Sequence, residues 1–193
     1  MWLHCVRHGE TPLNASGIFS GWGDEGLTKI CASRLASVDF DASGRDAVYC
    51  SPAFRCKETA RCLRLPSYIE EPRIVERHFG VFDGLSVSEV QEKYPEELAA
   101  FRRLDADFTI PGGESRAEHF RRVEEWLLEI SRKHRQVLAV THGGRIDFLY
   151  RLGTNGVLHG GEMVYAGPNA GLSIFEVSWP DVRVLEHGLP LLG

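Results

Sequence analysis

Residues 2–10 read Trp-Leu-His-Cys-Val-Arg-His-Gly-Glu, and this stretch predicts both the first strand and the place where chemistry is expected. The segment Trp2–Val6 is apolar enough to be buried on both faces, which is typical of a central strand in a parallel sheet. It runs directly into Arg7 and His8, and the Gly-, Asn- and Ser-rich stretch 9–26 that follows predicts a long loop. The sequence therefore predicts a central strand whose carboxyl end carries charged and titratable side chains.

Helical and strand-like segments alternate along the chain as far as residue 152. Apolar periodicity predicts helices at residues 27–38, 51–63, 86–103, 115–134 and 145–152. Strands are predicted at residues 47–50, 74–75, 136–141, 172–179 and 182–187. This alternation predicts an α/β fold, a three-layer α/β/α sandwich whose mostly parallel sheet has an antiparallel edge. We expect residues 1–193 to form a single domain, with residues 81–114 as a cap excursion.

Local signals set the expected helix limits. Thr28 is a possible cap for the first long helix, and Ser51 followed by Pro52 is typical of a helix start. The dipeptide Tyr94-Pro95 predicts a break within 86–103, and the glycine-rich stretch 153–171 predicts a loop. The longest helix, 115–134, is expected to bury an apolar face made of Phe120, Val123, Leu127, Leu128 and Ile130.

Composition limits the class of protein. The chain has 193 residues and a net charge of −5, with 43% hydrophobic residues, as expected of a globular domain rather than a nucleic-acid binder. No apolar run approaches the roughly 18 residues of a membrane span, and residues 1–6 lack the pattern of a secretory signal. The five cysteines are odd in number and lie in apolar segments, which favours reduced core thiols and a cytoplasmic location.

Charged and titratable side chains follow several of the predicted strands. In open parallel sheets, ligands bind beyond the carboxyl ends of the strands, so these side chains are expected to converge. Two guanidinium groups match the oxygens of a phosphate and offset its charge, and phosphate chemistry is the natural interpretation. The other histidines, including His119, lack this placement and are assigned structural roles. The converging residues are Arg7, His8, Arg55, Glu76 and His142.

Other chemistries fit less well. A metal site built from His8, Glu76 and His142 remains open, but no fixed ligand spacing supports it. His4-Cys5 opens like a cysteine phosphatase loop, yet Thr11 stands where that loop needs arginine. No nucleotide-binding glycine loop, zinc-protease helix or serine-hydrolase elbow is present in the sequence.

Five motifs in order resemble the histidine phosphatase superfamily, also called the phosphoglycerate mutase-like family. They are Arg7-His8-Gly9-Glu10-Thr11, Ser51-Pro52 with Arg55, Glu76-Arg77-His78-Phe79-Gly80, Gly112-Gly113-Glu114-Ser115, and Thr141-His142-Gly143-Gly144. The chain departs from the family pattern after Leu27-Thr28, where a glycine is usual, and at Lys57-Glu58. These departures do not touch the expected core residues.

The resemblance implies a role for each matched residue. His8 would be the nucleophile that takes the phosphoryl group, and Glu76 the general acid and base. Arg7, Arg55 and His142 would form the phosphate pocket, and no metal or organic cofactor would be needed. Three further positions would line this pocket, and one backbone amide at a helix start would add a donor. These are Asn14, Ser20 and Gly21, and the amide of Gly143.

The function expected from these residues is hydrolysis of a small phosphorylated metabolite. The alternatives are an isomerase of the phosphoglycerate mutase type and a catalytically idle binding member of the family. The balance of charges in the cap favours a monophosphate with an uncharged or partly apolar body, near Trp22, Phe79, Phe82 or Phe108. Members of the resembled family of this length include α-ribazole phosphatases, sugar-phosphate phosphatases and broad-specificity phosphatases. The sequence leaves the choice among them, and the oligomeric state, open.

Overall fold

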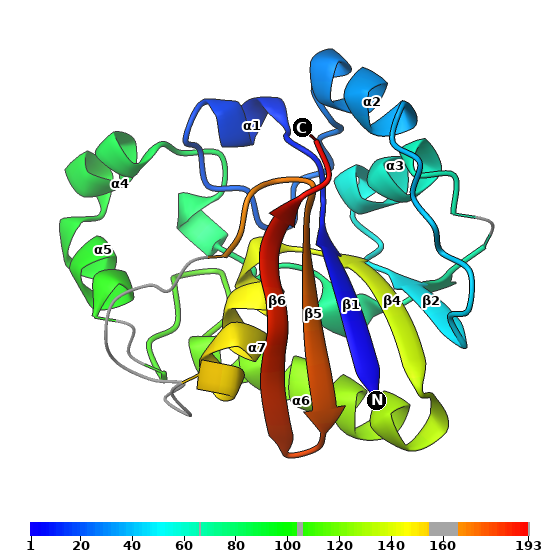
Figure 1. The fold of residues 1–193 in the computed structure, drawn as a ribbon. Coiled ribbons are helices and arrows are strands. Elements are labelled where there is room, and N and C mark those ends of the chain that lie inside the picture. Colours follow the sequence, from blue (N-terminus) through cyan, green and yellow to red (C-terminus); the bar gives the residue numbers. More distant parts are fainter. Residues whose placement is uncertain (66, 104–105, 155–165, 193) are drawn as a thin grey trace.

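A single six-stranded sheet organises the described part of the chain (Figure 1). The computed structural model describes residues 1–65, 67–103, 106–154 and 166–192. The strand order is β3-β2-β4-β1-β5-β6, so β1 lies in the middle, as its apolar sequence predicts. The strands are β1 (Trp2–Arg7), β2 (Ala47–Cys50), β3 (Ile69–Glu70), β4 (Gln136–Thr141), β5 (Gly171–Ser178) and β6 (Asp181–Pro190).

The pairing confirms a mostly parallel sheet with an antiparallel edge. Strand β1 pairs in parallel with β4, and β4 with β2, which places Arg7 beside Thr141 at the carboxyl ends. Strands β5 and β6 run antiparallel and close the other edge. The carboxyl ends of β1 and β4 therefore share one edge of the sheet, where ligand sites are expected in this class of fold.

Helices cover both faces of the sheet and confirm the three-layer architecture. On one face, α6 (Arg116–Lys133) and α7 (Gly143–Thr154) pack on the alternate strand residues Leu3, Cys5 and Val137. On the other face, α2 (Lys29–Ala36) and α3 (Phe54–Cys62) pack on Val6 and Val140. Thr28 caps α2, as expected, and Ser115 begins α6 in a capping box with Glu118.

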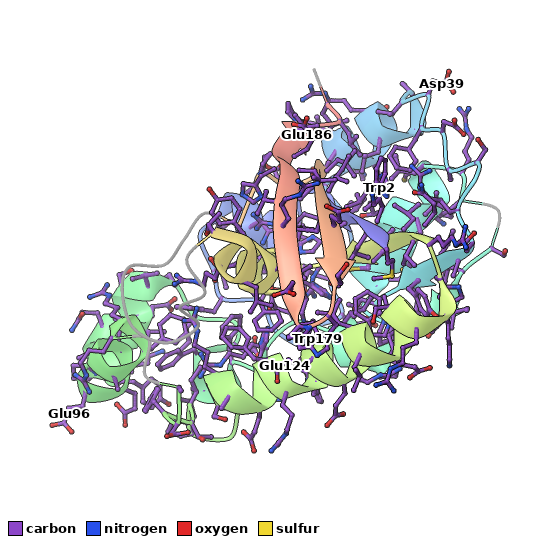
Figure 2. The ribbon with its side chains drawn as sticks, turned by 60° about the horizontal axis from the view of Figure 1, so that its bottom comes forward. Trp2, Asp39, Glu96, Glu124, Trp179 and Glu186 are labelled. Carbon is purple, nitrogen blue, oxygen red and sulfur yellow. The ribbon has the colours of Figure 1, made fainter. Side chains whose placement is uncertain are left out.

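The expected cap stands out from the body of the molecule, where Figure 2 labels Glu96 at its tip. It contains the short turn η2 (Gly80–Phe82), α4 (Val87–Lys93) and α5 (Pro95–Arg102), with the predicted break at Tyr94. A small apolar cluster of its own holds it together. The buried members of this cluster are Phe82, Val90, Leu98 and Ile110.

Several local expectations are wrong. The strand expected at residues 74–75 is not formed, because Pro72 initiates the 3₁₀ turn η1 (Pro72–Ile74), which includes Ile74 and ends before Val75. The edge position is taken by β3, which pairs with β2. Ser51 does not begin α3, whose N-cap is Ala53 without a side-chain bond. Leu128 is exposed, since it lies about 100° around α6 from buried Leu127, and Trp126 is buried instead.

The stretch predicted as a long loop after the first strand also contains a short helix. The loop after β1 contains a one-turn helix, α1 (Pro12–Ala15), in which Thr11 and Asn14 form a capping box. Of the expected loop 153–171, residues 155–165 lie outside the described residues.

The five cysteines are free thiols, four of them buried. Among the described residues, no helix combines the length and apolarity that a bilayer span requires.

Candidate active site

A cavity of about 540 Å³ lies beyond the carboxyl ends of β1 and β4, between the sheet edge and the cap. Its wall includes the end of β1, the α1 loop, the segment after η1 and the first turn of α7, and helices α4, α5 and α6 also contribute side chains. Of the residues expected from the sequence, those that line the cavity are Arg7, His8, Asn14, Ser20, Glu76 and Gly143. The structure therefore gathers most of the expected site around one space.

His8 is held as a neutral imidazole with one ring nitrogen available. Its Nδ1 lies 2.8 Å from the Gly9 carbonyl oxygen, which can only accept, so Nδ1 carries the proton and Nε2 keeps its lone pair. Burial, followed by the nearby guanidinium groups of Arg55 and Arg7, holds the pKa of His8 well below its usual range. The side chain lines the cavity. These features are what a nucleophilic histidine requires.

Arg55 and His142 are buried and do not line the cavity wall. The ring centroids of His8 and His142 are 5.2 Å apart. Nδ1 of His142 accepts from Arg55 over 3.2 Å, and Nε2 is 2.8 Å from the Ser51 hydroxyl. Arg55 also donates to the Gly21 carbonyl over 2.7 Å. The two side chains therefore form a buried, hydrogen-bonded pair, and the His142 ring is close to the imidazole of His8.

The element that precedes Glu76 and positions it at the cavity differs from the one that the sequence predicts. Glu76 follows η1 rather than a strand, and two backbone amides fix its carboxylate. Arg77 donates to Oε1 over 2.8 Å and Gly144 donates to Oε2 over 3.0 Å. The indole of Trp22 donates to the Glu76 carbonyl oxygen over 2.9 Å. Both oxygens of the carboxylate are thereby oriented beside the first turn of α7.

The smaller expected residues differ in their placement. Asn14 lines the cavity, and its Oδ1 accepts from Asn169 over 3.1 Å. Ser20 also lines the cavity and donates to Glu25. Gly21 lies outside the wall, because its amide donates to Asp83 over 2.5 Å and its carbonyl accepts from Arg55. The amide of Gly21 is therefore already engaged.

Glycines bring the backbone of α7 close to the charged side chains. A Cβ atom at Gly143 would lie 3.4 Å from the guanidinium carbon of Arg7. A Cβ at Gly144 would collide with the carboxylate of Glu76. The absent side chains allow the helix N-terminus, whose dipole favours anions, to face the cavity directly.

The far wall of the cavity contains residues that the sequence reading missed. Arg77, Arg116, His119 and Asp147 line it, together with Phe79 and the apolar side chains of Phe19, Phe101 and Phe120. Of the four aromatic residues expected near the substrate body, Phe79 lines the cavity, whereas Trp22, Phe82 and Phe108 do not. Neither His119 on α6 nor Asp147 on α7 belongs to one of the matched sequence motifs.

No three His, Cys, Asp or Glu side chains in the described ranges are grouped closely enough to hold a metal ion. The metal alternative built from His8, Glu76 and His142 therefore gains no support from the arrangement of these residues. The geometry instead presents a neutral imidazole, a fixed carboxylate and several cations around one cavity. These parts are suited to transfer of a phosphoryl group to and from a histidine.

The fold and the matched residues define the class of protein. The pattern of the histidine phosphatase superfamily (branch 1) matches residues 3–188, and the chain belongs to this superfamily.

Among its relatives is a metal-independent phosphoserine phosphatase of Arabidopsis thaliana, 36% identical over 156 residues, which cover 75% of this chain and 65% of that protein. A 2,3-bisphosphoglycerate-dependent phosphoglycerate mutase of Parvibaculum lavamentivorans is 32% identical over 161 residues, 76% of this chain and 77% of that protein. The structure of the α-ribazole phosphatase from Shigella flexneri has a TM-score of 0.77 and 23% identity, covering 100% of this chain and 98% of that one, which bears on the fold alone.

Proposed function

We propose that this protein is a metal-independent phosphatase that hydrolyses a small organic phosphomonoester through a phosphohistidine on His8. The observation that carries this proposal is the state of the His8 ring. Its Nδ1 is bound to the Gly9 carbonyl, and its neutral ring lines the same cavity as the Glu76 carboxylate. Membership of the histidine phosphatase superfamily supports the proposal.

The reaction proceeds in two steps. Nε2 of His8 attacks the phosphorus atom, the ester P–O bond breaks, and protonated Glu76 gives its proton to the leaving oxygen. Ionised Glu76 then takes a proton from a water molecule, whose oxygen attacks the phosphorus and breaks the P–N bond. The products are an alcohol and inorganic phosphate, and both residues return to their starting protonation states.

The surrounding residues stabilise the charge of the phosphoryl group as it transfers. The guanidinium of Arg7 and the amide of Gly143 bind its oxygens directly, together with the side chains of Asn14 and Ser20. Arg55 and His142 supply positive and polar groups close to His8, and Gly21 holds Arg55 in place through its carbonyl. Truncating Arg7 removes a charge-assisted contact and lowers kcat/KM by about 100-fold.

The phosphoglycerate mutase of Parvibaculum lavamentivorans gives a specific reason to test isomerisation as a second candidate function. A mutase must keep water away from the phosphorylated enzyme while its substrate reorients. Here only 31 residues separate Gly80 from Gly112, and the two short helices α4 and α5 make up about half of this stretch. We infer that so short and polar a cap admits water, and that hydrolysis dominates.

One batch of enzyme decides between the two functions and tests the absence of a metal requirement. After dialysis against a strong chelator, release of phosphate from phenyl phosphate should persist. Interconversion of 2- and 3-phosphoglycerate should be at least ~100-fold slower than hydrolysis of the preferred substrate, a difference of about 2.7 kcal/mol in activation free energy. Activity lost on chelation and restored by zinc or magnesium, or efficient interconversion with little free phosphate, would contradict the proposal.

We also propose that residues 1–193 work as one domain in the cytoplasm, with residues 81–114 as its cap. The free, mostly buried cysteines suit a reducing compartment. The substrate is proposed to be a small phosphorylated metabolite, as for the phosphoserine phosphatase of Arabidopsis thaliana, with no role for nucleic acid. A screen of phosphorylated metabolites by released phosphate tests the substrate class.

A further inference from the structure

Three polar side chains in the far wall of the cavity carry hydrogen-bonding atoms without partners among the described residues. Arg116, His119 and Asp147 are 7%, 3% and 5% exposed, and all three line the cavity. The unpartnered atoms are Nε of Arg116, both ring nitrogens of His119 and Oδ1 of Asp147. Buried polar atoms are normally satisfied, so such a group beside a cavity points to a ligand.

The group lies directly beyond the proposed catalytic residues. A Cβ at Gly144 would contact the Glu76 carboxylate and would lie 3.1 Å from Cε1 of His119, so the side chains of Glu76 and His119 both approach the backbone of α7 at Gly144. Arg116 precedes His119 by about one turn of α6. Asp147 follows Gly143 by four residues of α7, which corresponds to a rise of about 6 Å along the helix. A two- or three-carbon skeleton spans that length from a phosphoryl group.

The charges at this wall are of both signs. Oδ2 of Asp147 accepts from Arg151 over 2.9 Å and from Arg116 over 3.3 Å, which leaves Oδ1 as an open anionic acceptor. Burial raises the pKa of Asp147 and lowers that of Arg116, because each charge is removed from water. Burial also holds the pKa of His119 well below its usual range, so its ring is neutral.

Arg77 adds a second cation to the same wall. Its side chain lines the cavity and donates to the carbonyl oxygens of Glu114 and Phe108. The repulsion between its guanidinium and that of Arg116 contributes, after burial, to a pKa for Arg77 lowered to about 10. An anionic group placed between the two guanidinium groups would relieve this repulsion.

We propose that Arg116, His119 and Asp147 form a subsite for the head group of a phosphorylated amino acid, which carries an ammonium and a carboxylate. The ammonium donates to Oδ1 of Asp147 and to a ring nitrogen of His119, and the carboxylate accepts from Arg116 and lies near Arg77. A neutral polyol would satisfy the same atoms, but it would bring no carboxylate to the guanidinium groups of Arg77 and Arg116 and no ammonium to Oδ1 of Asp147. This inference rests on the proposed phosphatase function and adds its substrate class.

Wild-type enzyme tests the subsite without any variant. O-Phosphoserine carries both charged groups, 3-(phosphonooxy)propionate lacks only the ammonium, and phosphoethanolamine lacks only the carboxylate. With phenyl phosphate as the reference, kcat/KM for phosphoserine should exceed that of each analogue, and of ribose 5-phosphate, by at least about 10-fold. Equal values would overturn the subsite while leaving the phosphatase function intact. Failure to release phosphate from any compound, phenyl phosphate included, would overturn the function itself.

Two substitutions assign the groups to their partners. For Asp147→Asn, the ratio of kcat/KM for phosphoserine to kcat/KM for 3-(phosphonooxy)propionate should fall by about 10-fold. For Arg116→Gln, the ratio of kcat/KM for phosphoserine to kcat/KM for phosphoethanolamine should fall by about 10-fold. Glu71→Gln is the matched control, since Glu71 is a buried carboxylate paired with Arg73 outside the cavity wall. It should lower stability without altering either ratio. Ratios unchanged in the folded Asp147 and Arg116 variants would refute the assignment.

Discussion

Replacing Gly144 with alanine perturbs the proposed acid without replacing Glu76 itself. The new Cβ would collide with Oε1 of Glu76 and lie 3.2 Å from its Cδ, short of the roughly 3.5–4.0 Å of an ordinary carbon contact. The Gly144 amide also donates to Oε2, so the carboxylate is held on both sides. Glu76 must retreat by a distance on the order of 1 Å, and a misplacement of that size costs about 100-fold in rate.

The assay compares leaving groups. Gly144→Ala should lower kcat for an alkyl phosphate by about 100-fold and that for nitrophenyl phosphate by much less, because a good leaving group needs little help from an acid. Unfolding in urea should show no loss of stability from the helix itself, since alanine is favoured over glycine in a helix by about 0.5–1 kcal/mol. Gly44→Ala, strained at a φ of 69° and outside the cavity wall, controls for changes in stability alone. Equal slowing on both esters, or none, would refute the placement of Glu76.

Four further predictions follow from the same structure. Glu76→Gln should slow alkyl phosphates about 10²- to 10⁴-fold and aryl phosphates less, measured as kcat. Burial holds the pKa values of three histidines well below the usual range; they are His8, His119 and His142. The unfolded chain therefore binds more protons, and the free energy of unfolding should fall as pH drops below about 6.5, by up to about 1.4 kcal/mol per pH unit for each histidine. Urea titrations at pH 7 and 5.5 measure this fall, and constant stability would contradict it. In the native protein a thiol reagent should label Cys62 first, because the other four thiols are buried, and rapid labelling of all five would contradict the packing. Phe82→Ala should cost about 3–5 kcal/mol and raise KM, since Phe82 is fully buried in the cap cluster, and an unchanged urea midpoint would show that the cap is loosely packed.

The parts of the fold that periodicity determines could be predicted from the sequence. Strands β2 and β4 match their predicted limits, and β1 extends one residue beyond its predicted limit, because uninterrupted apolar runs in a parallel sheet have few alternatives. The break between α4 and α5 also follows from Tyr94-Pro95, since proline restricts the residue before it.

Short elements and tertiary contacts could not be predicted. Residues 74–75 resembled a strand, but Pro72 initiates a 3₁₀ turn and β3 takes the edge of the sheet through only two residues. Ser51 resembled a helix cap, yet its hydroxyl bonds the ring of His142, 91 positions away in the sequence. A local pattern carries no information about a partner so distant in the chain.

The candidate site likewise contains some residues that the sequence predicts and others that it does not. Arg7, His8 and Glu76 belong to motifs, and the structure places all three around the cavity. His119 and Asp147 belong to none, and both are buried residues of helices, His119 on α6 and Asp147 on α7, where a sequence indicates only core packing. Only the cavity and the unpartnered atoms of these two residues distinguish them from ordinary core residues.

The central claim is that the phosphoryl group passes through His8, and trapping the intermediate tests it most directly. Enzyme turning over a phosphomonoester is quenched within milliseconds at alkaline pH, digested, and analysed by mass spectrometry for phosphorylated peptides. We expect a phosphoryl group on the peptide that carries His8, labile in acid, and absent together with turnover in His8→Ala. A phosphoryl group on another residue, or a His8→Ala variant that hydrolyses substrate at near the wild-type rate, would contradict the account.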